Sequence, residues 1–101
     1  MSRSFASFEE FYPFYLSEHS NQTCRRLHFI GTTMGLLLFT AAIVTQNYWL
    51  FLLGFVQGYA WAWVGHFFFE HNKPATFKYP FYSFVGDWYM YRDMLTGKIK
   101  W

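Results

Sequence analysis

Two long apolar segments, separated by only two residues, constrain the fold of this chain more than any other feature. The two segments are residues 27–45 (LHFIGTTMGLLLFTAAIVT) and 48–69 (YWLFLLGFVQGYAWAWVGHFFF). Neither contains Asp, Glu, Lys or Arg, and each contains a single histidine, His28 in the first and His66 in the second. As α-helices they would be about 28 and about 33 Å long, and a bilayer hydrocarbon core is about 30 Å thick. Because only Gln46–Asn47 lies between them, they predict two transmembrane helices in a tight antiparallel hairpin.

The composition also indicates a membrane environment. Apolar residues make up 53% of the 101 residues and aromatic residues 27%, whereas charged residues reach only 14%, against about a quarter in soluble domains. A soluble domain of this size has no core large enough to bury so many aromatic rings. We therefore expect one all-α membrane domain over residues 1–101, built on the two-helix transmembrane hairpin. A single cysteine excludes an internal disulfide, and no secretory signal is recognisable.

The positive charges orient the predicted hairpin. All eight Lys and Arg residues lie before residue 27 or after residue 72, and none lies in the two-residue turn. The positive-inside rule therefore places both termini in the cytoplasm. We expect an integral membrane protein in contact with membrane lipid, in a bacterial inner membrane, or in the endoplasmic reticulum if the chain is eukaryotic. The scattered basic residues are membrane anchors and do not indicate binding of nucleic acid.

A short helix is expected before the hairpin, over residues 7–18. Ser7 and Glu10 fit a capping box at its start. The transmembrane helices themselves are placed at 23–45 and 48–70.

A further helix is expected after the hairpin, over residues 83–96. Ser83 is the expected N-cap and Gly97 the expected stop signal. A stripe of aromatic residues suits a helix that lies in the membrane interface. Asp87 has no assigned role, and we expect it on the solvated side of this helix.

All four histidines are expected in one layer at the cytoplasmic face. In a hairpin centred on the two-residue turn, residues at equal depth have numbers that sum to about 93, and those of His28 and His66 sum to 94. His19 lies shortly before the first span and His71 shortly after the second. The topology alone therefore gathers the four imidazoles.

Such a layer predicts a metal site. Imidazole nitrogen and carboxylate oxygen are the usual ligands of non-haem ferrous iron, which also needs open positions for oxygen and substrate. Glu70 lies one helical turn after His66 and joins the candidates. The alternative is a set of interfacial histidines that hydrogen-bond to headgroups or to the backbone.

Helical phase places small and aromatic residues on the same helix faces as His28 and His66. Two GxxxG pairs, Gly31 with Gly35 and Gly54 with Gly58, permit close helix approach. The same small residues would also leave a slot for an acyl chain, and both interpretations stay open. The residues expected along such a slot are Gly35, Phe39, Tyr59 and Trp63.

The chain resembles the membrane-bound 2-hydroxy fatty acid dioxygenases of phytosphingosine breakdown in the endoplasmic reticulum, and especially their short bacterial members. The resemblance covers roughly residues 8–97 and rests on two segments, FYLSEHSNQTCRRLHFIGT and WVGHFFFEHNKPATFKYPFYSFVGDWYMYRDMLTGK. The motif residues are Tyr15, His19, Asn21, His28, Gly65, His66, Glu70, Pro74 and Ala75.

The resemblance implies Fe(2+) bound by histidines, without haem, and oxidative cleavage of a 2-hydroxy fatty acid by O2 between C1 and C2. The product would be a fatty acid one carbon shorter. His19, His28 and His66 would be the principal ligands, with His71 as a fourth. Glu70 would either ligate the iron or orient one of the ligand histidines from the second coordination sphere.

Two arginines complete the candidate site. Arg25 and Arg26 lie at the headgroup level and would steer the substrate carboxylate, with Arg25 counted among the catalytic candidates and Arg26 among the substrate-binding ones. Their alternative role is plain anchoring by the positive-inside rule. Because a lone hairpin is thin, the flanking helices must complete the site, or two copies must pair as a homo-oligomer.

Three other functional classes remain as alternatives. His28 and His66 could bind haem axially, as in an electron-transfer protein. A small transporter usually carries a carboxylate deep within a span, which is missing here. A non-catalytic membrane protein would use its aromatic surface to hold a partner.

Overall fold

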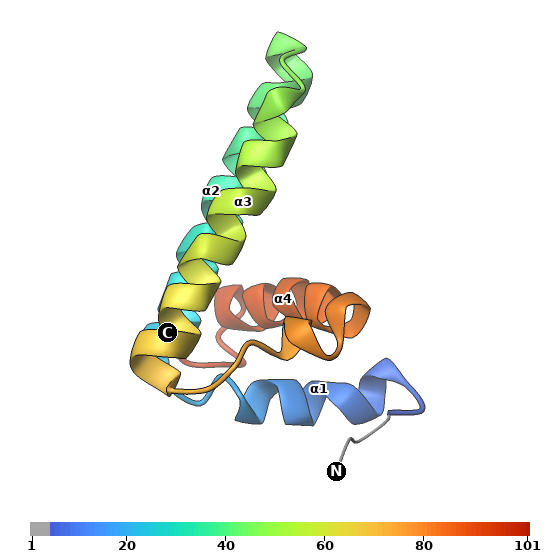
Figure 1. Ribbon diagram of the computed structural model, residues 1–101, viewed down its shortest axis with the longest axis vertical. Coiled ribbons are helices and arrows are strands. Elements are labelled where there is room, and N and C mark those ends of the chain that lie inside the picture. The colour runs from blue at the N-terminus through green and yellow to red at the C-terminus, as the bar shows by residue number, and fades with distance from the viewer. Residues whose placement is uncertain (1–4) are drawn as a thin grey trace.

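Helices make up most of residues 5–101, the part of the chain that the computed structural model describes (Figure 1). They are α1 (Phe8–Ser17), α2 (Gln22–Thr45), α3 (Trp49–Val64), a π-helical turn η1 (Gly65–Glu70), a 3-10 turn η2 (Ala75–Phe77) and α4 (Pro80–Leu95). No strand occurs in these residues, so the expected all-helical class is confirmed. Arg3, one of the cations that oriented the predicted hairpin, lies outside the described residues.

The molecule is an upright hairpin with two helices across its base. Figure 1 shows α2 and α3 side by side and antiparallel, with α1 and α4 lying across the end opposite the hairpin turn. The principal extents are 45 × 26 × 26 Å, and the long dimension is that of the hairpin. Both ends of the described chain are therefore at the base.

Local signals explain where α2 begins and ends. The side-chain oxygen of Asn21 accepts a hydrogen bond from the N–H of Cys24 at 3.0 Å and caps the N-terminus. Gln46 adopts a left-handed conformation, with φ at 58°, and reverses the chain toward α3. Among the described residues, α2 is the one helix that is long and apolar enough to cross a membrane. With 16 residues, α3 is about 24 Å long, so the second predicted span is not confirmed as one α-helix.

The end of the second apolar segment is a π-helical turn, where we expected a continuous α-helix to residue 70. Such turns are rare and occur often at functional sites. Gly65, its first residue, allows the close approach of α2, since a Cβ there would lie 3.1 Å from the Cα of Cys24. The turn closes where His71 adopts a left-handed conformation, with φ at 60°. The N–H of Asn72 then donates to the carbonyl of His66 at 3.0 Å.

Helix α4 begins earlier than the sequence predicted. Its first residue is Pro80, whose fixed φ suits the first helical position. Ser83 therefore lies inside the helix and is not its N-cap, which corrects the prediction. At the start of α1 the hydroxyl of Ser7 accepts from the N–H of Glu10 at 3.4 Å, as expected. The carboxylate of Glu10 accepts from Ala6 at 3.0 Å, one residue before the position that a capping box would use.

The buried core lies at the base, where α1 and α4 pack on each other. Its members are Phe11, Tyr15, Ala75, Met90 and Met94. The outside of the hairpin, in contrast, exposes large apolar side chains over its whole length, among them Leu37, Ile43, Val44, Leu52, Leu53 and Val56. The hairpin thus has the surface of a lipid-exposed element.

Glycines and one glutamine hold α2 against α3. The amide nitrogen of Gln57 donates to the carbonyls of Gly31 and Gly54, both at 2.8 Å. A Cβ on Gly31 would lie 3.2 Å from the carbonyl oxygen of Gly58, whereas a Cβ on Gly58 would have no neighbour closer than 3.9 Å. Gly31 of α2 is therefore required for the close approach of the two helices, and Gly58 of α3 is not.

This asymmetry predicts different effects of two matched substitutions. Gly31→Ala should destabilise the protein by on the order of 1–3 kcal/mol, because the backbone of α3 must move away. Gly58→Ala should be neutral, or stabilising by up to about 1 kcal/mol through helix propensity. Thermal unfolding in detergent, followed by circular dichroism, measures both. Equal destabilisation by the two variants would contradict the described contact between the helices.

Candidate metal centre

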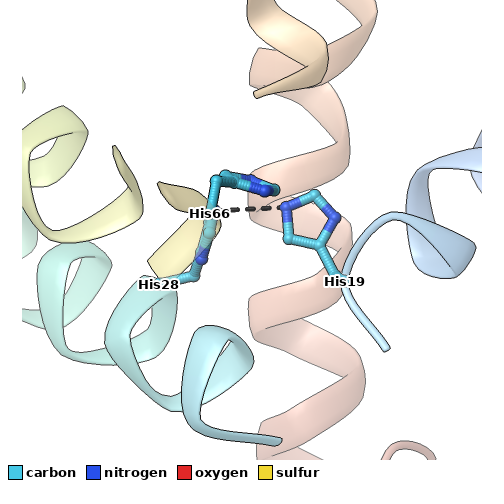
Figure 2. A group of neighbouring side chains, drawn as sticks. All are labelled: His19, His28 and His66. Carbon is cyan, nitrogen blue, oxygen red and sulfur yellow. Dashed lines mark hydrogen bonds between the residues drawn. The ribbon is translucent and has the colours of Figure 1, made fainter. Parts of the chain in front are cut away.

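Three histidines from three different segments meet at the base of the hairpin. His19 lies in the loop after α1, His28 in α2 and His66 in η1, and Figure 2 shows their rings turned toward one another. One ring nitrogen of each lies within 4.8 Å of the others, and the Nε2 atoms of His19 and His28 are 3.1 Å apart. Ring centroids are separated by 4.5 to 4.9 Å, and the ring planes cross at 76° to 90°. All three side chains are buried.

Hydrogen bonds on the opposite side of each ring fix its orientation. The Nδ1–H groups of His19 and His28 donate to the carbonyls of Tyr15 at 2.7 Å and Cys24 at 2.8 Å, because a carbonyl can only accept. Nδ1 of His66 lies 2.7 Å from the side-chain oxygen of Asn72. The Nε2 atom of each ring therefore carries the lone pair, which is the tautomer that metal-binding histidines adopt through such partners.

The orientation of Asn72 is itself fixed. Its amide nitrogen donates to the carbonyl of Glu18 at 3.1 Å, which leaves the side-chain oxygen facing His66 as an acceptor. Asn72 thereby links the residues after η1 to the end of α1. Sequence reasoning did not single out Asn72, although its place just past the apolar segment, six residues after His66, was a usable signal.

The electrostatics of the group favour a cation at its centre. Burial and the two neighbouring histidines hold the pKa of His19 well below its usual value, so its imidazole stays neutral. Three neutral rings then direct their Nε2 lone pairs into one small space. The lone pairs repel one another there, and a cation bound between them would attract all three. The donor set, its spacing and its burial fit a transition metal ion.

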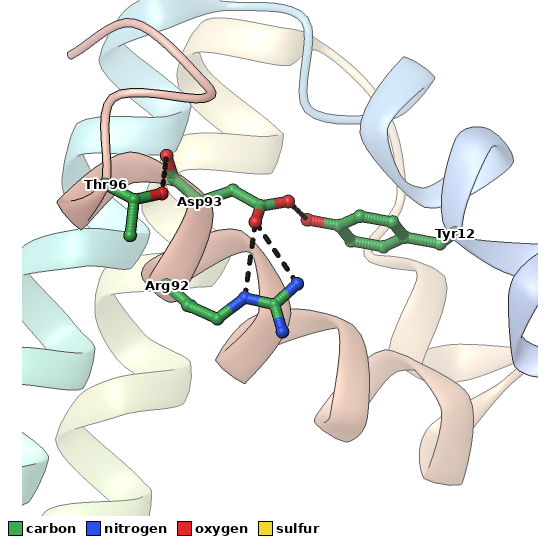
Figure 3. Close-up of polar contacts among 4 residues, drawn as sticks. All are labelled: Tyr12, Arg92, Asp93 and Thr96. Atoms are coloured by element: carbon green, nitrogen blue, oxygen red, sulfur yellow. Dashed lines mark hydrogen bonds and ion pairs between the residues drawn. The ribbon is translucent and has the colours of Figure 1, made fainter.

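Helix α1 is positioned over the site by contacts with α4. The Tyr15 ring stacks on the His19 ring at a centroid distance of 4.1 Å, and its hydroxyl donates to Asp87 of α4. Nearer the start of α1, the hydroxyl of Tyr12 donates to Asp93 at 2.7 Å (Figure 3). Arg92 lies 3.3 Å from the same buried carboxylate. These bonds hold His19 in place through Tyr15.

Two adjoining cavities lie beside the histidines. The cavity of about 60 Å³ extends along the hairpin, and Gly35, Phe39 and Tyr59 are among its lining residues. A smaller one, of about 10 Å³, is lined by all three histidines and by Trp63. His28, Tyr59, Ala62 and Asp87 line both. Of the five residues predicted to contact substrate, Gly35, Phe39, Tyr59 and Trp63 line a cavity next to the histidine group, and Arg26 does not.

Two predicted ligands are not in the group. His71 is exposed and, one residue past the π-helical turn, does not join the other three histidines. Glu70 accepts hydrogen bonds from the backbone N–H of Asn21 and from the hydroxyl of Ser20, the latter at 3.3 Å. It therefore holds the loop between α1 and α2 in place, and through it the segment that carries His19.

The two arginines are also engaged away from the cavities. Arg25 donates to the carbonyls of His19 at 3.1 Å and Ser20 at 2.8 Å. Arg26 donates to the carbonyl of Trp101 at 3.0 Å, and its guanidinium lies 5.2 Å from the centre of that ring. Neither arginine lines either cavity. The structure thus places Arg25 behind His19 as a support for the loop.

Asp87 is not on a solvated face, which corrects the expectation from the sequence. Its carboxyl lies between the Tyr15 hydroxyl and the two cavities. Burial raises the pKa of this carboxyl to about 7, and the hydrogen bond from Tyr15 partly opposes that rise. Only the return of α4 across the base brings Asp87 here, and no local pattern in the sequence reports that return.

The geometry predicts which histidines bind metal. His19→Ala, His28→Ala and His66→Ala should each lose tight binding of ferrous iron, because two imidazoles make an incomplete site. His71→Ala is the matched control and should bind about one iron per chain, as the unaltered protein should. Elemental analysis of anaerobically reconstituted protein in detergent measures the ratio. Loss of iron in His71→Ala, or its retention in His28→Ala, would contradict the assignment.

One comparison with known proteins shows the family of this chain. Residues 5–99 match the family described as "2-hydroxy-palmitic acid dioxygenase Mpo1-like". The match covers α1, the hairpin, the three histidines and α4. No curated protein and no solved structure matches the chain significantly. By this match over nearly its whole length, the chain belongs to the Mpo1-like family of 2-hydroxy-palmitic acid dioxygenases.

Proposed function

We propose that this protein is a non-haem Fe(II)-dependent dioxygenase that cleaves 2-hydroxy fatty acids between C1 and C2. The observation that carries the proposal is the convergence of His19, His28 and His66, with Nδ1 of each bonded outward and Nε2 directed toward the other rings. The overall balance is one O2 consumed per substrate, giving the fatty acid one carbon shorter, carbon dioxide and water. Four electrons leave the substrate carbons, which is what the reduction of one O2 requires.

Three imidazoles on one side of an ion suit this chemistry. They leave the remaining coordination positions free, as a ferrous oxygenase site needs. When bound there, ferrous iron would supply the site at which a 2-hydroxy carboxylate and dioxygen can react. The chain's own part is to hold three neutral donors in fixed positions in a buried space, which Tyr15, Cys24 and Asn72 do through the Nδ1 atoms.

The cavity along the hairpin is an argument that the substrate is a fatty acid, because an acyl chain would fit in it. Its lining is mostly glycine and aromatic residues, and it contains no Lys or Arg. His28 lies at the end of this cavity nearest the base and also belongs to the metal group. A chain bound along α2 and α3 would thus present its first carbons to the histidines. Phe84 and Trp88 of α4 belong to the lining of this cavity, which supports the flanking helices as the elements that complete the site.

We also propose that α2 and the continuous segment of α3 and η1 both cross the membrane, with the base and both termini on the cytoplasmic side. The exposed apolar surface of the hairpin supports this arrangement, because such a surface is costly in water. The π-helical turn continues α3 by six residues, so helix reaches from Trp49 to Glu70. The distribution of Lys and Arg gives the orientation.

An axial haem site is a poorer explanation of the same histidines. A porphyrin held between any two of these imidazoles would need the space that the third imidazole fills, because all three ring centroids lie within 4.9 Å. A role as a structural subunit does not account for three buried imidazoles whose Nε2 atoms face one another, since burying polar groups together is costly.

The reaction itself is the test of the proposal. Ferrous-loaded protein supplied with 2-hydroxypalmitate and O2 should form pentadecanoate, measured by mass spectrometry, with one O2 consumed per product. His66→Ala should reduce the rate at least a hundredfold, and the His71→Ala control should keep most of it. Zinc-loaded protein should form no product. No pentadecanoate from fully iron-loaded, folded protein would contradict the proposed function.

A further inference from the structure

Two polar side chains of α4 point into the cavity beside the histidines, although neither belongs to the metal group. Ser83 and Asp87 are four residues apart, so they lie one above the other on the same face of the helix. Both line the small cavity that the three histidines also line. α4 thus presents a hydroxyl and a carboxyl toward the space where Nε2 lone pairs converge.

Ser83 has no partner within the protein. Its side chain is 2% exposed, and its hydroxyl oxygen is buried without a hydrogen bond. A buried hydroxyl that lacks a partner costs free energy, and native structures rarely leave one unexplained. Because the hydroxyl lies in the lining of a cavity, a bound molecule is the natural partner.

Asp87 has one partner on its protein side. The hydroxyl of Tyr15 donates to one carboxyl oxygen, which fixes the side chain at the junction of the two cavities. Neither lining contains a Lys or Arg side chain that would pair with the carboxyl. The carboxyl is therefore an oriented acceptor at the point where the head of a bound acid would meet its apolar tail.

We propose that Ser83 and Asp87 form the head-group subsite for the 2-hydroxy acid, with Ser83 donating to the substrate carboxylate and Asp87 accepting from its 2-hydroxyl. This inference rests on the proposed function and names the groups that select the substrate. The two substrate groups are on adjacent carbons, and side chains one helical turn apart are about 5–6 Å apart at Cβ, so one acid can bridge them.

The proposal explains how the site would distinguish a 2-hydroxy acid from an ordinary fatty acid. The ordinary acid keeps the bond to Ser83, but the Asp87 carboxyl oxygen that Tyr15 does not bond then has no donor. A buried acceptor left unpaired disfavours the wrong ligand more than a missing apolar contact does. The pKa of about 7 also means that the carboxyl is only partly charged near neutral pH, which limits its repulsion of the substrate carboxylate.

Binding without turnover tests the subsite. Ferrous-loaded protein is kept free of oxygen, and 2-hydroxypalmitate, 2-methoxypalmitate and palmitate compete with a fluorescent fatty acid. Asp87→Ala should lower the preference for 2-hydroxypalmitate over palmitate roughly tenfold, since one hydrogen bond to a carboxyl is lost. Ser83→Ala should weaken the binding of 2-hydroxypalmitate and of palmitate by the same factor, roughly three- to tenfold. Ser17→Ala, at an exposed serine of α1, is the control and should change neither affinity.

The methoxy acid keeps the test decisive if Asp87→Ala fails to fold. In the unaltered protein 2-methoxypalmitate should bind no more tightly than palmitate, because its ether oxygen cannot donate to Asp87. Tight binding of the methoxy acid, or an unchanged preference in folded Asp87→Ala, would overturn the role of Asp87. Unchanged affinities in Ser83→Ala would overturn the role of Ser83. Selective binding without any product would instead contradict the proposed reaction and leave the subsite standing.

Discussion

The structure depends on three buried imidazoles that face one another, each held by a hydrogen bond behind it. Burying His19, His28 and His66 together is costly unless each polar atom has a partner. The Nδ1 atoms find theirs in two backbone carbonyls and in Asn72. The Nε2 atoms face one another, with those of His19 and His28 3.1 Å apart, so a cation bound between them would offset the cost. The base of the molecule is best understood as the scaffold of that centre.

Each element at the base has a part in holding this arrangement. The loop that carries His19 is fixed by Glu70 and Arg25, and its ring is covered by Tyr15. Tyr15 is in turn held by α4 through Asp87. The π-helical turn carries His66, and Asn72 then bonds back to both the turn and the end of α1. Glu70, expected at the iron, and Arg25, expected at the substrate carboxylate, therefore support the loop that carries His19.

Much of the site follows from the hairpin and is readable in the sequence. A two-residue turn between two apolar segments requires His28 and His66 to be level, and they meet at a ring-centroid distance of 4.9 Å. The face shared with His28 likewise predicted Gly35 and Phe39 beside a cavity. These inferences need only helix geometry and one turn, which are local properties of the chain.

The remaining features depend on contacts between distant segments. His71 was predicted among the ligands, but it is itself the left-handed residue that ends the π-helical turn, and it does not join the other three histidines. Ser83 looked like an N-cap, but the helix begins three residues earlier at Pro80, whose fixed φ suits the first helical position. Asp87 looked solvated because an aromatic helix in the interface was expected to turn its polar side to water. Only the packing of α4 on α1 places Ser83 and Asp87 at the cavity.

X-ray absorption spectroscopy at the iron edge of ferrous-loaded protein tests the central claim most directly. The account predicts about three imidazoles per iron, recognisable by scattering from the outer ring atoms. It predicts no sulfur, since the Cys24 sulfur lies 3.8 Å from Nδ1 of His28, on the side of that ring away from the centre. Iron surrounded by oxygen atoms alone, without imidazole scattering, would contradict the claim that these three histidines form the metal centre.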